Sequence, residues 1–325
     1  QYICTNQESQ IRPAKHSDDR LVVLGQYQEL VGGRVVLRDG KQTEQSPSAE
    51  MGLAMGARFR TMADVSNCYH SLYTHSIPWA LVGHSTAKQN RNAALWYNEL
   101  DKNARGCKRG ETQGLPIGPG TSAILSEVVL GKVDEEMRTR GYRFVRYIDD
   151  YRCYCLTREE ADGFVRDLEA ALAKYLLALN AKKVLVDELP VPQRPEWLID
   201  LANHVPEGTD VKPRKITDTL DYALALQKRF PEANVLKYAA RTLVSRLCHD
   251  GAESYVRYLA MMASHCPMVL PLLCQASVEH GVTVPEDTCI GMLKRHLLYR
   301  RSDAVCWGLY PVSYTHLTLP TKRIV

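Results

Sequence analysis

The sequence lacks a long apolar run, paired cysteines and a strong charge imbalance. No apolar run approaches the roughly 18 residues of a membrane-spanning helix, so we expect no membrane partner. None of the ten cysteines forms a CxxC pair, so we expect buried free thiols in a reducing cytoplasm rather than a disulfide framework or zinc site. With 41 Lys and Arg against 37 Asp and Glu, the net charge of +4 permits a nucleic-acid partner without requiring one.

The length of the chain limits the number of domains. Its 325 residues, 45% of them hydrophobic, suffice for one large domain or two ordinary ones. The chain begins with Gln1 rather than Met, so we expect a fragment of a longer protein. The segment VSYTHLTLPTKRIV (312–325) resembles a translated sequencing adapter, and fold predictions exclude it.

Residues 60–190 alternate between strand and helix signals. RFRTMADVS begins as a short strand, and YHSLYTHSIPWAL reads as a helical stretch after a polar turn. TSAILSEVVLGKVDEEMRTRG (121–141) predicts a helix capped by Thr121 or Ser122 and ended by Gly141. FVRYIDDYRCYC (144–155) predicts two strands around a tight turn.

The remaining signals complete an α+β pattern. A capping box of Thr157 and Glu160 opens a helix that we expect to reach about Leu177, and LNAKKVLVDELP follows as a loop and strand. The order β-α-α-β-β-α-β predicts a split βαβ sheet with helices on one face. Residues 216–311 carry amphipathic helical segments broken by Pro and Gly, which predict a helical-repeat domain or a plain helical bundle.

Two adjacent acids, Asp149 and Asp150, stand in the predicted hairpin turn. An Asp pair in a turn is most often simply solvated, but β-forming residues flank this one and would hold it rigidly. Crowded carboxylates are costly unless a divalent cation neutralises them. Asp64, at the end of the strand in TMADVSNCY, is a third candidate ligand, although it would also serve as a helix N-cap. Together the three acids predict a site for two metal ions.

The loop QGLPIGPGTS (113–122) combines glycines and prolines directly before a predicted helix. Glycine lets the backbone approach a base or phosphate closely, and a helix N-terminus favours phosphate. Alone, this loop is a weak signal for nucleotide binding.

Four segments together resemble a known family. DVSNCY, QGLPIGPGTS, RYIDDY and LNAKK resemble motifs A, B, C and D of reverse transcriptases in order and approximate spacing, over about residues 60–200. CYHSLYTHSIPWAL and PIGPGTS resemble the bacterial abortive-infection and defence-associated groups, which commonly carry a helical-repeat domain. The resemblance implies partial fingers at 1–59, a right-hand, RRM-like palm at 60–200 and an α-helical domain at 201–311, before the adapter-like 312–325.

The resemblance also implies roles for individual residues. Asp64, Asp149 and Asp150, with the Val65 carbonyl, would hold two Mg²⁺ ions, or Mn²⁺ in their place. Lys183 would protonate the departing pyrophosphate, unless it is simply an exposed lysine on a turn. The remaining implied contacts are to the incoming nucleotide: Tyr69 as a steric gate against ribonucleotides (or a core aromatic), with Gln113, Gly114, Pro116, Gly118 and Ser122. Candidate triphosphate-binding cations are Lys15, Arg20, Arg58 and Arg60.

The expected function is RNA-directed DNA synthesis in bacterial antiphage defence, in the cytoplasm. The expected partners are dNTPs, an RNA or DNA template and primer or a protein primer, and further copies of the chain through the helical domain. Ile117 stands where most relatives carry Gln, which leaves template-independent or protein-primed synthesis open. An inactive palm that serves as a scaffold is a third reading. A viral RNA polymerase fits less well, because Gly usually precedes its Asp pair.

Overall fold

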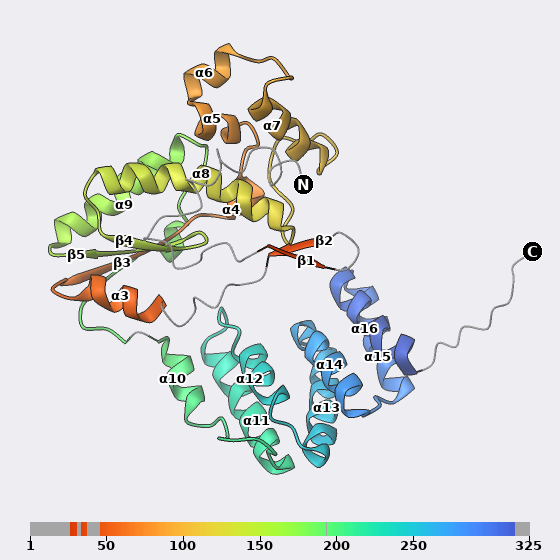
Figure 1. Ribbon diagram of the computed structural model, residues 1–325. Coiled ribbons are helices and arrows are strands. Elements are labelled where there is room, and N and C mark those ends of the chain that lie inside the picture. The colour runs from red at the N-terminus through yellow and green to blue at the C-terminus, as the bar shows by residue number, and fades with distance from the viewer. Residues whose placement is uncertain (1–26, 31–33, 38–45, 193, 316–325) are drawn as a thin grey trace, which may run out of the picture. The chain divides into compact units, whose positions relative to one another are not determined.

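The computed structural model describes residues 27–30, 34–37, 46–192 and 194–315, with side chains described for 50–192 and 194–309. The chain divides between Val191 and Pro192 into two compact units, here called the N-terminal and the C-terminal unit. The N-terminal unit runs from red to green in Figure 1 and the C-terminal unit from green to blue. The predicted fingers residues 1–26, with Lys15 and Arg20, and residues 316–325 of the adapter-like segment lie outside the described residues.

A four-stranded antiparallel sheet organises the N-terminal unit. The strands are β3 (Phe59–Asp64), β4 (Phe144–Tyr147), β5 (Asp150–Cys155) and β6 (Leu185–Glu188), in the spatial order β4-β5-β3-β6. The register sets Phe59 opposite Cys155 and Asp64 opposite Asp150. A separate antiparallel hairpin consists of β1 (Tyr27–Leu30) and β2 (Arg34–Leu37).

Helices cover both faces of this sheet, whereas the sequence predicted helices on one face. Helices α8 (Gly120–Thr139) and α9 (Arg158–Ala173) lie on one face, and α3 (Ser46–Ala54) lies on the other (Figure 1). Side chains alternate along β5, so Tyr151 and Cys153 face the main core while Arg152 and Tyr154 turn to the opposite side. There Glu50 of α3 accepts hydrogen bonds from both Arg152 and Tyr154.

Four short helices stand between β3 and α8, where the sequence predicted one. They are α4 (Cys68–Ser71), α5 (Ser76–Val82), α6 (His84–Gln89) and α7 (Trp96–Gly106). The break between α5 and α6 falls at Gly83, whose φ of 86° is outside the helical region and suits glycine. Helix α5 packs against α6, α7 and α8, and so joins this group to the main core.

The predicted caps of α8 and α9 are right in part. α8 begins at Gly120 after Pro119, without a side-chain cap, so the predicted Thr121 or Ser122 cap is wrong. The extended Pro119 is the N-cap residue, so the helix starts two residues earlier than a Thr121 cap would place it and three earlier than a Ser122 cap would. The apolar stripe of α8 is buried as predicted, at Ile124, Leu125, Val128, Val129, Val133 and Met137.

The capping box at α9 forms around Thr157. The Glu160 amide donates to the Thr157 hydroxyl over 3.1 Å, and the Glu160 carboxylate accepts from the Leu156 amide over 2.8 Å. α9 ends at Ala173 rather than near Leu177, because the chain turns through Leu176 with a φ of 61°. A 3-10 turn, η2 (Ala181–Lys183), then leads into β6.

The C-terminal unit contains helices but no named strand among its described residues. Its elements are α10 (Glu196–Ala202), α11 (Pro213–Arg229), α12 (Val235–Val244), α13 (His249–Ala263), η3 (Pro267–Val269), α14 (Leu270–His280), α15 (Glu286–Leu298) and α16 (Ser302–Thr315). One apolar core includes the fully buried leucines 220, 243, 259 and 273. The protein is therefore α+β with a helical C-terminal part.

Two predictions from composition are tested by this fold. None of the described helices has the length and apolar content needed to cross a bilayer. The nine described cysteines are free, and Cys68, Cys153, Cys155, Cys274 and Cys289 are buried. Cys107 and Cys306 are exposed, so the prediction of buried thiols is wrong for these two, and Cys4 lies outside the described residues.

Candidate active site

Three acidic residues meet at one end of the central strands. Asp64 is the last residue of β3 and pairs in register with Asp150, the first residue of β5. Asp149 precedes Asp150 in the β4–β5 turn, and its carbonyl accepts a 3.1 Å hydrogen bond from the Val65 amide. Backbone pairing, rather than side-chain contact, therefore brings Asp64 next to the Asp pair.

The acidic cluster is electrostatically unfavourable without a counter-charge. Burial raises the pKa of Asp149, and the charges of Asp150 and Asp64 raise it further. Burial also raises the pKa of Asp150, again with a contribution from Asp64. Asp64 itself is only 6% exposed, so little water reaches it to screen these charges. A cation is the simplest group that relieves this repulsion.

Lys183 supplies one such counter-charge. Its Nζ forms an ion pair with Asp64 Oδ2, and that contact raises the pKa of Lys183. The Asn180 amide donates to the Asp64 carbonyl over 2.8 Å, and the Asn180 side chain accepts from the Lys182 amide over 3.2 Å. The turn that carries Lys183 is thus anchored on the strand that carries Asp64.

The acids match divalent cations in chemistry, because Mg²⁺ and related ions prefer carboxylate oxygens. The raised pKa values of Asp149 and Asp150 are typical of a site that binds positive charge. In the described part of the chain, however, no three His, Cys, Asp or Glu side chains converge as a ready metal site. The Oδ2 atom of Asp64 is paired with the Lys183 ammonium instead.

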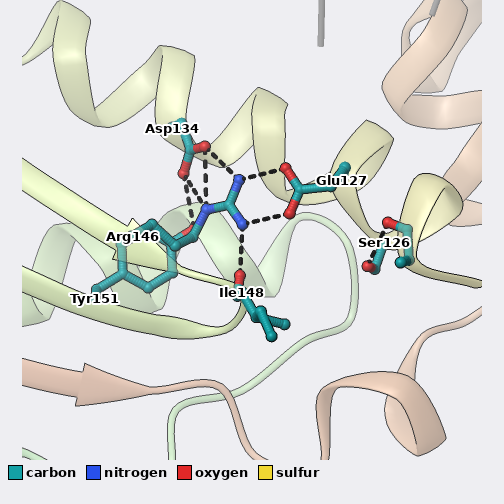
Figure 2. Close-up of polar contacts among 7 residues, drawn as sticks. Ser126, Glu127, Asp134, Arg146, Ile148 and Tyr151 are labelled. Atoms are coloured by element: carbon teal, nitrogen blue, oxygen red, sulfur yellow. Dashed lines mark hydrogen bonds and ion pairs between the residues drawn. The ribbon is translucent and has the colours of Figure 1, made fainter. Parts of the chain in front are cut away.

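A buried arginine that no sequence motif had singled out fixes the turn that carries the Asp pair. Arg146, on β4, is 2% exposed and lies between two acids of α8 (Figure 2). Its guanidinium contacts Glu127 over 2.8 and 2.9 Å and Asp134 over 2.7 and 3.0 Å. Its Nη1 also donates to the Ile148 carbonyl, inside the turn. Tyr151 donates to Asp134 over 3.0 Å and closes the network.

This network holds a backbone conformation that is rare for its residue type. Ile148 has a φ of 57°, which is unfavourable for a β-branched side chain. Burial alone would lower the pKa of Arg146, but Asp134 and Glu127 raise it well above its usual value. The arginine is therefore always charged, and it links α8 to the residue before Asp149. A sequence signal existed, because Glu127 and Asp134 stand seven positions apart on the buried stripe of α8 (134 − 127 = 7).

Tyr69 lies on α4 close to the acids. Burial raises its pKa, and the nearby charges of Glu127 and Asp149 contribute to the increase. Its hydroxyl contacts Ser126 on α8, and its ring packs partly buried against the main core. The structure therefore places the Tyr69 ring against the core and near the acids, and its role as a steric gate stays a prediction.

The loop of residues 113–115 pairs with the chain around α4. The Gly114 amide donates to the Leu72 carbonyl over 2.8 Å, and the Leu115 amide donates to the Tyr69 carbonyl over 2.6 Å. The Gln113 side chain donates to the Ser71 carbonyl over 2.7 Å. A Cβ on Gly114 would meet the His70 carbonyl oxygen at 2.7 Å, so only glycine fits. The loop is thereby fixed beside Tyr69.

The other residues of this loop differ in exposure. Gly118 is exposed with a φ of 111°, and Pro116 is half-buried. Ile117 is 66% exposed, which is unusual for a large apolar side chain. Ser122 is buried in the first turn of α8, and its amide donates to the Pro119 carbonyl over 3.0 Å.

Two candidate triphosphate-binding cations lie on β3 or just before it. Arg60 is buried and forms a 2.8 Å hydrogen-bonded ion pair with Asp187 of β6. Arg58 is exposed and lies 3.6 Å from Glu188. Both therefore interact with acids of the edge strand in this structure.

The sequence matches the family model described as reverse transcriptase (RNA-dependent DNA polymerase) over residues 27–192. No curated protein matches the chain. The matched segment contains the three clustered acids, Lys183, Tyr69 and the loop beside it. Reverse transcriptases use divalent metal ions and bind dNTPs with a template and primer. The chain therefore belongs to the reverse transcriptase family and is a nucleotidyltransferase of the RNA-directed DNA polymerase class.

Proposed function

We propose that the chain adds deoxynucleotides to a 3′ end at the cluster of Asp64, Asp149 and Asp150. The observation that supports this most directly is the register of β3 and β5, which sets Asp64 opposite Asp150. Two divalent cations, Mg²⁺ with Mn²⁺ as an alternative, would activate the primer hydroxyl and neutralise the leaving pyrophosphate. The chain's own contribution is to hold the three carboxylates and the Val65 carbonyl in place for them.

In this proposal Lys183 has two successive partners. In this structure it neutralises Asp64, and with a cation at Asp64 its ammonium would be available to donate a proton to the departing pyrophosphate. Its side chain is 63% exposed, so it can reorient without disturbing the core. A lysine ammonium is protonated at neutral pH, and the contact with Asp64 raises the pKa of Lys183 further.

Tyr69 and the loop at 113–122 form the proposed contact to the incoming nucleotide. Tyr69 excludes a 2′-hydroxyl by occupying its space. Gln113, Gly114, Pro116, Gly118 and Ser122 shape the adjoining loop, held by its hydrogen bonds to α4. For Tyr69→Ala we expect increased use of ribonucleotides relative to deoxynucleotides, whereas Tyr69→Phe, which keeps the ring, should retain discrimination.

Arg146 is proposed to act on this site through position rather than contact with substrate. It hydrogen-bonds the Ile148 carbonyl and anchors the turn to Glu127 and Asp134. Without the guanidinium, the Ile148 backbone loses the partner that holds its positive φ. Misplacement of catalytic carboxylates by about 1 Å is enough to reduce turnover about a hundredfold.

The finer assignment follows the resemblance in the sequence. We propose right-hand palm architecture for residues 60–200 with partial fingers at 1–59, and a helical-repeat domain at 201–311 that mediates homo-oligomer formation. Residues 312–325 are proposed to derive from a sequencing adapter. Membership of the bacterial defence-associated groups, a cytoplasmic location and a role in abortive infection are part of the same proposal.

Template-independent or protein-primed synthesis is the second candidate. The 66% exposed Ile117 favours it, because this apolar side chain stands where most relatives have a glutamine next to the nascent base pair. A template strand would lose that polar contact, while addition of nucleotides to an unguided primer would not need it.

The deciding experiment measures incorporation of labelled dNTPs with Mg²⁺ by the full chain, with and without a primed RNA template. Asp149→Asn removes a proposed metal ligand and should reduce incorporation by about a thousandfold or more. Asp162→Asn is the matched control, since Asp162 is an exposed acid of α9. Template-dependent synthesis supports reverse transcription, and template-independent synthesis supports the second candidate. Equal, background-level signals from wild type and Asp149→Asn would contradict both.

A further inference from the structure

A polar cavity lies among the short helices α5, α6 and α7. Its volume is about 400 Å³, within the range of small-ligand pockets. The residues that line it belong to the segment between Tyr73 and Arg105. None of them is one of the clustered acids or of the proposed nucleotide contacts. The cavity therefore shares no residue with the proposed polymerase site.

One wall of the cavity is aromatic. Trp79 is 9% exposed, and its ring centroid lies 5.7 Å from that of the half-buried Tyr73, with the rings inclined at 59°. The Lys88 Nζ lies 5.2 Å from the centroid of the Trp79 ring. Tyr and Trp walls of this kind stack flat heterocycles such as nucleobases.

The cavity has an excess of positive charge. Lys88, Arg91, Lys102 and Arg105 line it against a single carboxylate, Asp101. Arg105 Nε lies 3.3 Å from Asp101 Oδ2, so that carboxylate is already matched. Among the described residues, no carboxylate pairs with Lys88, Arg91 or Lys102. Three cations beside an aromatic wall favour an aromatic ligand that carries an anion.

Asp101 is a buried polar residue of the lining, and a specific hydrogen bond holds it in place. The residue is 4% exposed, and its Oδ2 accepts from His75 Nδ1 over 2.8 Å. Its Oδ1 is buried with no hydrogen-bond partner in the described part of the chain. A buried carboxylate oxygen without a partner is unfavourable, and a donor group that entered with a ligand would satisfy it.

We propose that this cavity binds a nucleotide, with the base against Trp79 and Tyr73 and the phosphate at Lys88, Arg91 and Lys102. The same chemistry is presented by a free nucleotide and by an unpaired nucleotide of a nucleic-acid strand. The cationic side chains Lys88, Arg91 and Lys102 are exposed, so either source reaches them from solvent. Binding in this cavity does not depend on the polymerase reaction, because none of the lining residues is one of the clustered acids.

The test uses the full chain carrying Asp149→Asn, so that binding is read without incorporation. The probes are 5-iodo-dUMP and a short single-stranded oligonucleotide with one 5-iodouracil, which cross-links to aromatic side chains on irradiation. We expect the cross-link at Tyr73 or Trp79, and not at Tyr69, which belongs to the proposed contact to the incoming nucleotide. Cross-linking of the oligonucleotide alone identifies a strand as the ligand, and cross-linking of both identifies the nucleotide itself.

Charge-removing variants locate the phosphate. Lys88→Gln with Arg91→Gln should raise the Kd for the cross-linked probe about tenfold or more. Arg158→Gln with Arg166→Gln, which removes two exposed cations from α9, should change it less than about twofold. Equal weakening by both pairs, cross-links only outside residues 73–105, or no binding of either probe would overturn the proposal. Absence of DNA synthesis in the wild type would contradict the polymerase proposal and leave this result unaffected.

Discussion

The two units of the chain bury different kinds of side chain. In the N-terminal unit the buried set includes Asp64, Asp101, Glu127, Asp134 and Arg146, whereas the described buried polar residues of the C-terminal unit are only Thr219 and His296. Hydrophobic burial accounts almost alone for the packing of the C-terminal unit. The N-terminal unit combines its apolar core with buried charged side chains that hold strand ends and turns in place. Buried charged groups therefore concentrate in the unit that matches the reverse transcriptase family model.

The largest effect is expected from removing the charge at the centre of the buried network. Arg146→Met removes the buried guanidinium that contacts both Glu127 and Asp134, which should destabilise the N-terminal unit by about 3–5 kcal/mol. Hydrogen exchange followed by peptide should show the loss in β4, β5 and α8 and not in residues 213–298. Arg143→Met, which alters an exposed arginine just before the same strand, should have little effect. Unchanged exchange in Arg146→Met would show that the network is dispensable.

The corresponding change in the helical unit removes apolar volume. Leu259 on α13 is fully buried, and Leu259→Ala should cost about 2–5 kcal/mol through lost burial and the cavity left behind. Leu297→Ala, at a side chain that is 60% exposed, is the control and should change stability little. Urea unfolding monitored by exchange within residues 213–298 measures both variants. Equal costs at the two leucines would contradict the assigned core.

A smaller effect is expected in the loop beside Tyr69. Gly114 and Gly118 both have positive φ, but only Gly114 lacks space for a Cβ. Gly118→Ala should cost about 1 kcal/mol from backbone strain alone, and Gly114→Ala about 1–3 kcal/mol more. Thermal unfolding of the two variants compares them directly. If Gly118→Ala proves the more harmful, the close approach of residue 114 to His70 is not what fixes the loop.

The smallest effect should come from His296, a fully buried histidine of the C-terminal unit. Burial lowers its pKa below the ordinary 6.5, and the charges of Arg301 and Arg295 add to this. Its Nε2 pairs with the Ala263 carbonyl over 3.0 Å, while Nδ1 has no partner among the described residues. Well above pH 6.5 the His296 imidazole is neutral in both the folded and the unfolded state. As pH falls from 6.5 through the lowered folded pKa, the unfolded state binds the proton first and stability is lost.

Comparing His296→Gln with the wild type isolates this contribution. Between pH 7 and pH 5 the C-terminal unit should lose more stability in the wild type than in the variant. The difference in the free energy of unfolding should be less than about 2 kcal/mol. His280→Gln, on α14, serves as a matched histidine control and should follow the wild type. Parallel pH profiles for wild type and His296→Gln would show that the buried imidazole is not responsible.

Local patterns in the sequence predicted the main elements well. Apolar periodicity identified α8 and the helices between residues 217 and 266, and the alternation around RYIDDY identified the hairpin of β4 and β5. The four short helices after β3 were not resolved, because each is too short to carry a periodic signal. The cap of α8 was misplaced, since proline geometry competed with two nearby hydroxyl residues.

The candidate site residues rest on the resemblance to reverse transcriptases, and their roles remain predictions. The sequence contained the acids and the lysine but not their contacts. Strand register decided that Asp64 stands opposite Asp150, and the ion pair between Lys183 and Asp64 depends on the fold of the intervening chain. Side-chain identity is local, whereas register depends on which strands pair.

The sequence by itself determined the α+β pattern, the helical C-terminal part and the order of the four motifs. Only the tertiary structure decided that Arg146 lies between Glu127 and Asp134 and holds the turn of the Asp pair. It alone also placed Tyr73, Trp79 and Lys88 around one cavity. The physical reason is that periodicity and propensity act over neighbouring residues, while ion pairs and cavities arise between elements that only packing brings together.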